Sequence, residues 1–181
     1  AYQGGFAVRC KPTDGSGTRV IHLFDNSGNP TGTIAQTSSG AAYDTGRGDG
    51  TRIAGHINSP YIFLFGQPAG SSVMKLAAWD TRNPERVALF DASEPAFAGG
   101  FDRANLAVDA LNRVTVSWVS KPDGYEQQQV AARVLALNGD TMTITALTPS
   151  FLAFVNAAKT GDIRSVGMSV AMTTKQICIA A

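Results

Sequence analysis

Val114-Thr115-Val116-Ser117-Trp118 alternates apolar and polar side chains, and Met142-Thr143-Ile144-Thr145 follows the same two-residue period. A period of two, with β-branched and aromatic residues at the apolar positions, is typical of β-strands. Turn signals such as Asp49-Gly50 and Asn138-Gly139 separate these runs at short, regular intervals. The pattern predicts an all-β fold. Residues 150–159 alone favour a short helix, because they are rich in Ala and Phe and begin with a capping Ser.

Similar turns recur along the chain. Pro12, Pro68 and Pro122 each stand in a short Gly-containing turn, and they are 56 and 54 residues apart. A second turn recurs at Asp25 and Asp80, and its third copy, at Asn138, is altered. Recurrence at a fixed period indicates a repeat architecture.

The repeat predicts a unit of roughly 53–60 residues with four strands, a, b, c and d. The expected series is b-c-d, then a-b-c-d twice, then a-b. The units lie at about 1–48, 49–101, 102–161 and, in part, 162–181, within one repeat-built domain spanning 1–181. Phe65, Trp118 and Cys178 each follow an Asp by 16 residues, so we expect them at equivalent positions.

The strand patterns at 114–118 and 130–135, together with the turn at Asp25, give the chain a likeness to known proteins. On these motifs it resembles the repeats of secreted bacterial β-propellers. The resemblance implies a propeller-like fold of four-stranded blades. Three units and a fraction do not close a ring of at least about four blades. The chain is then a piece of a longer propeller, part of a ring that a second chain completes, or another fold, a β-trefoil or a β-sandwich.

Composition excludes several classes of function. The formal charge is +1 and 16% of residues are charged, so no basic stripe for nucleic acid is present. No apolar run approaches the roughly 18 residues of a membrane-spanning helix. Hydrophobic residues make up 44% of the chain, enough for a sizeable core.

Two cysteines, Cys10 and Cys178, lie near opposite ends of the sequence. They are either two buried thiols or one disulfide. The start at Ala1 rather than Met fits an export history, so we expect the disulfide and a secreted, periplasmic or cell-surface location.

Candidate ligand residues lie mainly in turns. Tyr125, beside Asp123 at a turn tip, and Trp79 are the predicted ligand-binding residues, since aromatic rings stack on sugars. Asp44 and Asp49 offer hard oxygen ligands for calcium, the one cofactor considered, although no EF-hand spacing is present.

No catalytic set can be assembled. His22 and His56 lie in different units, and no nucleophile elbow occurs. We therefore expect a non-catalytic, exported structural or protein-interaction module that assembles with partner chains or with itself. The alternatives are a carbohydrate-binding module and part of a secreted glycoside hydrolase. The weakly charged strands around Phe6-Ala7-Val8 and residues 176–179 favour association at the ends of the chain.

Overall fold

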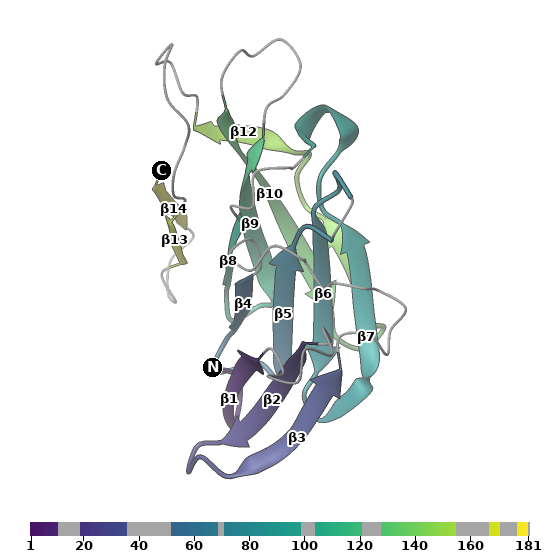
Figure 1. Cartoon of the computed structure of the whole chain (residues 1–181), viewed down its shortest axis with the longest axis vertical. Helices are drawn as coiled ribbons and strands as arrows, with labels where there is room; N and C mark the ends of the chain where they lie inside the picture. Colours follow the sequence, from purple (N-terminus) through teal and green to yellow (C-terminus); the bar gives the residue numbers. More distant parts are fainter. Residues whose placement is uncertain are drawn as a thin grey trace.

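The computed structural model describes residues 1–10, 19–35, 52–68, 71–98, 104–120, 128–154, 167–170 and 177–180. This part of the chain is all-β, as predicted, and its strands form three antiparallel sheets and a separate hairpin (Figure 1). Its helical content is a single 3-10 turn, Pro95–Phe97.

Strand order within each sheet follows the chain. Sheet A contains β1 (Gly5–Cys10), β2 (Val20–Asp25) and β3 (Pro30–Ala35). Sheet B contains β4 (Arg52–Gly55), β5 (Tyr61–Gly66), β6 (Lys75–Asp80) and β7 (Asn83–Asp91). Sheet C contains β8 (Ala104–Val108), β9 (Arg113–Ser120), β10 (Gln129–Asn138), β11 (Thr143–Ala146) and β12 (Phe151–Phe154). The hairpin, sheet D, contains β13 (Gly167–Val170) and β14 (Ile177–Ala180).

The expected series requires three, four, four and two strands. Sheets A, B and D have three, four and two strands, and sheet C has five. The described strands form no closed barrel or ring.

The fifth strand corrects the helix predicted at 150–159 over residues 151–154, and residues 155–159 lie outside the described part. Residues 151–154 pair with the first half of β10, whereas β11 pairs with its second half. Between them, Leu147 N donates to Val134 O at 2.8 Å, and Val134 N donates to Thr148 Oγ1 at 3.0 Å. β11 and β12 thus act as one interrupted edge strand. The reason is that β10 has ten residues and pairs with β9 along one edge only. Along its other edge, a helix would leave the backbone N–H and C=O groups of β10 unpaired.

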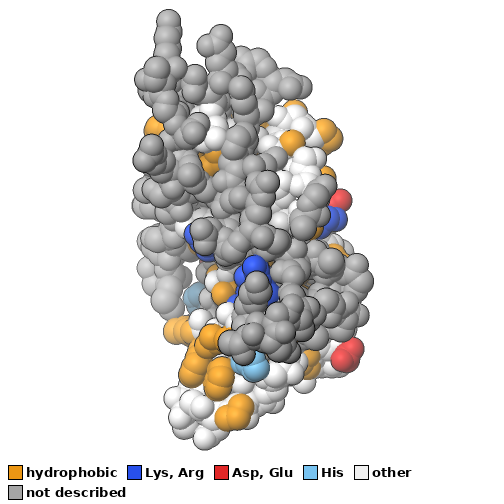
Figure 2. Space-filling model, in the orientation of Figure 1, with side chains coloured by type: hydrophobic (Ala, Val, Ile, Leu, Met, Phe, Trp, Pro, Cys, Tyr) orange, Lys and Arg blue, Asp and Glu red, His pale blue; other side chains and the backbone are white. Residues whose placement is uncertain are grey.

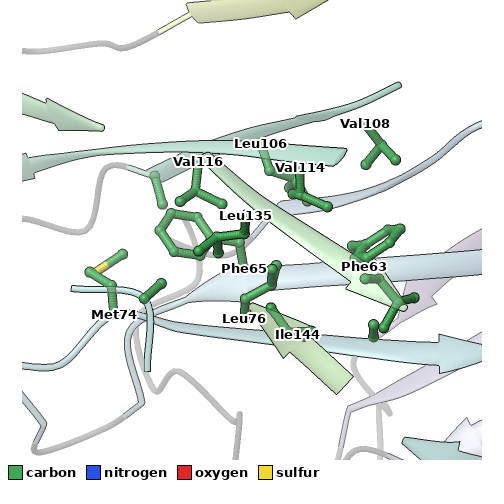
Figure 3. Packing of buried hydrophobic residues seen from close by; sticks show 14 of the residues in the cluster. Phe63, Phe65, Met74, Leu76, Leu106, Val108, Val114, Val116, Leu135 and Ile144 are labelled. Atoms are coloured by element: carbon green, nitrogen blue, oxygen red, sulfur yellow. The ribbon is translucent and has the colours of Figure 1, made fainter. Parts of the chain in front are cut away.

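The larger hydrophobic core lies between sheets B and C. Phe63 and Phe65 of β5 share this core with Val116 and Trp118 of β9 and with Leu135 of β10. Figure 3 shows Phe65 beside Leu135, and Phe63 on the side of Val108 and Val114. The rings of Phe65 and Trp118 meet edge to face at 6.1 Å between centroids, and Trp118 is fully buried. Each large side chain buried in this way contributes about 1.5–3 kcal/mol.

This contact corrects the expected equivalence of Phe65 and Trp118. Both residues lie on the second strand of their four-stranded series. Phe65 faces sheet C, which follows its own sheet in the chain, whereas Trp118 faces sheet B, which precedes its own sheet. Equivalent residues of stacked units face the same direction, so equal spacing from an Asp does not make these two equivalent.

A smaller core lies between sheets A and B. It joins Ile21 and Leu23 of β2 to Ile62 and Leu64 of β5 and to Trp79 of β6. Because alternate residues of β5 enter the two cores, all six residues of that strand are buried. Sheet B is therefore the middle layer of a stack.

The recurrent second turn gives a consistent alignment of the three sheets. Asp25, Asp80 and Asn138 end β2, β6 and β10, and each side chain accepts the backbone N–H two residues on, at 2.8, 3.0 and 3.0 Å. The residue before each turn is Phe24, Trp79 or Leu137. Trp79 packs toward sheet A, and Leu137 packs toward sheet B. In this alignment the position before the turn faces the sheet that precedes it in the chain.

Candidate interaction surface

The exposed side of sheet A is the strongest candidate site. Strand alternation turns Ile21 and Leu23 into the core and the neighbouring residues outward. Cross-strand register then pairs the outward residues of β1 and β2. We call this set the outer face: Phe6, Val8, Cys10, Val20, His22 and Phe24.

Apolar side chains dominate the outer face. Phe6 is 37% exposed and Val8 is 41% exposed. The rings of Phe6 and Phe24 stack at 5.1 Å between centroids, with 11° between planes. Figure 2 shows hydrophobic side chains gathered at the lower end of the molecule, where sheet A lies in Figure 1. A contiguous exposed apolar patch is typical of a binding surface.

The start of β1 is held rigidly under this face. Tyr2 and Gly5 exchange backbone hydrogen bonds at 2.9 and 3.1 Å, and the Tyr2 hydroxyl donates to Phe24 O at 3.0 Å. A Cβ at Gly5 would overlap the Phe24 carbonyl oxygen, so only glycine fits there. Gln3 N donates to Ser59 O at 2.8 Å, which ties this end of sheet A to sheet B.

A polar cluster joins sheets B and C at their turns. Asp80, whose side chain is 3% exposed, receives Arg82 Nε at 2.8 Å and Arg86 Nη1 at 3.2 Å. Arg86 Nη2 reaches across to the carbonyl oxygens of Gly139 and Asp140, at 3.0 and 2.8 Å. Hydrogen bonding from Arg82 holds the pKa of Asp80 below its usual range. This carboxylate is ionised and engaged by two guanidiniums, so it stabilises the sheet junction and is not a proton donor.

Arg133 makes a second link between the same sheets. From β10 it donates to Ala92 O at 3.0 Å, pairs with Glu94 at 3.0 Å and lies over the Phe90 ring. Glu94 also lines a pocket of about 210 Å³ with Ser72, Val73, Ser93, Pro95 and Ala98. Among the described lining residues Glu94 is the one carboxylate, and it is paired with Arg133.

Trp79 is a correction to the sequence analysis. It is 1% exposed and belongs to the core between sheets A and B, so its ring cannot stack on a ligand. The other predicted ligand residues, Asp123 and Tyr125, and the predicted calcium ligands, Asp44 and Asp49, lie outside the described residues.

Cys10 is a free, exposed cysteine on the outer face. The structure therefore shows no bond from Cys10 to Cys178, whose side chain is outside the described part. Cys178 lies on β14, which pairs with β13.

Asp25 and the two histidines have local surroundings in the described part of the chain. The Asp25 carboxylate accepts Ser27 N and Asn29 N, both at 2.8 Å, within its own turn. His56 is buried and accepts Asn58 N at 3.2 Å, whereas His22 lies on the outer face. The described residues contain no cluster of three or more potential metal ligands.

Sequence reasoning pointed to weak charge around Phe6 and Val8 but missed Arg82 and Arg86. Arg82 pairs with Asp80, two residues before it, whereas Arg86 also reaches Gly139 and Asp140 of another sheet, a contact that no local pattern marks. No family model, curated protein or solved structure matches this chain. In the described part of the chain, no helix has the length and apolar character needed to cross a membrane.

Proposed function

We propose that this chain is a non-catalytic structural or protein-interaction module that associates through the outer face of sheet A. One observation carries the proposal. Phe24 stands at the same place before its turn as Trp79 and Leu137, both of which are buried against a preceding sheet. Phe24 has no such sheet over it among the described residues and is only half-buried.

The proposal includes a propeller-like arrangement of repeat units. It is supported by the chain-ordered sheets, by the shared turn at Asp25, Asp80 and Asn138, and by the common direction in which the residues before those turns face. The first strands of sheets B, C and D, which are β4, β8 and β13, also support the arrangement, since β8 lies beside both β4 and β13. In such a stack each sheet covers one face of the next, and an end sheet keeps one face for a partner.

The two alternative functions have less support. Carbohydrate binding loses Trp79 as a stacking platform because that ring is buried. Glycoside hydrolysis requires two opposed carboxyl groups, one of which carries a proton. Asp80 cannot be the protonated member of such a pair, because two arginines hold it ionised.

Dye binding tests the accessibility of the outer face independently of any one partner. Anilinonaphthalene sulfonate reports exposed apolar surface, and we expect it to bind the dilute, monomeric chain. Val8→Lys should reduce the fluorescence severalfold. Leu111→Lys is the matched control, because Leu111 is 70% exposed but lies in the β8–β9 turn. Equal fluorescence from the unmodified chain and Val8→Lys would contradict the proposal.

A further inference from the structure

We infer that the edge of β1 that faces away from β2 binds an extended segment of a partner protein, which completes sheet A as its first strand. The inference goes beyond the proposed function, because it concerns an edge of sheet A and not its outer face. We call this site the β1 edge.

The repeat alignment shows that sheet A lacks a first strand. The shared turn ends β2, β6 and β10, so the strands before them, β1, β5 and β9, correspond to one another. β5 pairs with β4 on its other side, and β9 pairs with β8. Sheet D also begins with a strand, β13, that pairs with the next one. Among the described strands, none takes this position beside β1.

The backbone of β1 directs hydrogen-bonding groups into the empty position. Tyr2 and Gly5 exchange both backbone hydrogen bonds, so Gly5 directs its N–H and C=O away from β2. These directions alternate along an antiparallel strand. Ala7 therefore directs its N–H and C=O to the β1 edge, whereas Val8 bonds to His22 of β2. A strand that continues from the Tyr2–Gly5 pair would bond to Ala7 next.

The empty position is in line with the first strands of the other sheets. β8 lies beside both β4 and β13. Ala1, which precedes the Tyr2–Gly5 pair, lies against β4, because a Cβ on Gly55 would be 2.6 Å from the Ala1 carbonyl oxygen. A strand added to β1 would thus lie next to β4, as β8 does. The far edges of the last strands are different, since sheets A, B and C show no further strand beyond them in the described part of the chain.

The two first strands of the main sheets indicate which side chains fit this position. Ile53 of β4 and Leu106 of β8 pack toward the sheet that precedes their own. The adjacent residues that point to the opposite side are small, Ala54 and Ala107. By this pattern the segment has a small residue opposite Ala7, between aliphatic residues that extend the outer face. Backbone hydrogen bonds then supply affinity and the alternate side chains supply specificity.

A peptide with the sequence of residues 104–108 is the probe, because β8 fills this position in sheet C. Asp109 N donates to Arg113 O at 3.0 Å. Alternation from this bond turns the N–H of Ala107 toward the neighbouring strand and that of Leu106 away from it. N-methylation at the position of Ala107 therefore removes a donor to β1. N-methylation at the position of Leu106 is the matched control.

Nuclear magnetic resonance measures binding and amide exchange on the whole chain. Pairing of a single short strand is marginal, so we expect a dissociation constant of about 1 mM for the capped peptide with a lysine tail. At ten times this concentration the exchange rate of the Ala7 amide should fall about tenfold. N-methylation at the Ala107 position should weaken binding at least about fivefold, and at the Leu106 position less than about twofold.

Ala7→Pro tests the same contact from the side of the protein. Proline removes the N–H that points to the β1 edge and leaves the bonds between β1 and β2 in place, as on other edge strands. We expect peptide binding to fall at least about fivefold. Leu111→Lys, in the β8–β9 turn, should bind like the unmodified chain. If Ala7→Pro does not fold, the two methylated peptides still decide the question.

Three results would overturn the inference. In the isolated chain the Ala7 amide should exchange at least about tenfold faster than the Val8 amide, and equal protection would show that the β1 edge is already occupied. The absence of binding at about 5 mM peptide, or equal affinity of the two methylated peptides, would show that the edge takes up no strand. Dye binding at the outer face does not require the β1 edge, so failure here is distinguishable from failure of the proposed function.

Discussion

Replacing Asp80 with Asn tests whether the cluster at the B–C junction stabilises the fold. The substitution keeps the shape and the acceptor for Arg82 N but removes the charge that faces two guanidiniums. A hydrogen bond to a charged group is worth about 1.5–3 kcal/mol, and loss of one partner of a buried pair costs about 3–5 kcal/mol. The side chains of Arg82 and Arg86 are 61% and 36% exposed, so water partly replaces the lost contact. We expect a loss of about 2–3 kcal/mol.

Urea unfolding followed by tryptophan fluorescence measures this loss, because both tryptophans lie in the cores that the cluster borders. With a slope of about 2 kcal/mol/M, the midpoint should fall by about 1 M. Asp91→Asn is the control. Asp91 pairs with Lys75 at 2.6 Å, but its side chain is 64% exposed, so its loss should cost less than about 1 kcal/mol. If the two variants unfold at the same urea concentration, the stabilising role of Asp80 is refuted.

The pH dependence of stability follows from the same group. The pKa of Asp80 is lowered in the folded chain, chiefly by hydrogen bonding from Arg82. Its contribution is therefore complete above the unfolded pKa of about 3.9 and is lost as pH falls through the folded value. Below pH 4 the unmodified chain should lose stability more steeply than Asp80→Asn. Parallel curves would show that Asp80 is not the group responsible.

Three further predictions concern single residues. Gly5→Ala should lower the melting temperature by more than roughly 10 °C, because the new Cβ overlaps the Phe24 carbonyl, whereas Gly32→Ala, with space around its Cβ, should change it little. Trp118→Phe should cost about 2–3 kcal/mol in urea unfolding through lost volume and a lost indole hydrogen bond, and a cost below about 0.5 kcal/mol would contradict its central packing. Cys10 should react with iodoacetamide in the dilute native chain within minutes, and mass spectrometry that finds it unmodified would contradict its free, exposed state.

Much of the fold could be predicted because its signals are local. The two-residue period at 114–118 gave a strand, and the turns at Asp25, Asp80 and Asn138 formed where the sequence indicated. An Asx side chain that accepts a hydrogen bond two residues on depends on its own neighbours alone, which makes it readable from sequence.

The errors have a different origin, since each concerns contacts between distant segments. The aromatic ring of Trp79 favours ligand binding by type alone. It is buried because sheet B is covered on both faces, which periodicity does not reveal. Residues 150–159 favoured a helix by composition, but the edge of β10 required a strand at 151–154. Phe65 and Trp118 matched in spacing, yet spacing does not record which side of a sheet a residue occupies. The predicted disulfide is also not formed, because Cys10 is a free thiol, and the predicted export stays a prediction.

The position of sheet B has a consequence for how the molecule comes apart. Every residue of β5 is buried, and alternate residues contribute to one core or the other. Sheets A and C make their main apolar contacts with the two faces of this layer, so neither core can open without exposing a side of β5. Sheet B thus couples the stability of sheets A and C. A substitution that destabilises the core at Leu23 should therefore lower the hydrogen-exchange protection of the Val116 amide in sheet C. The amides of β5 should be the last to exchange with deuterium, and the described layers should unfold as one cooperative unit rather than sheet by sheet.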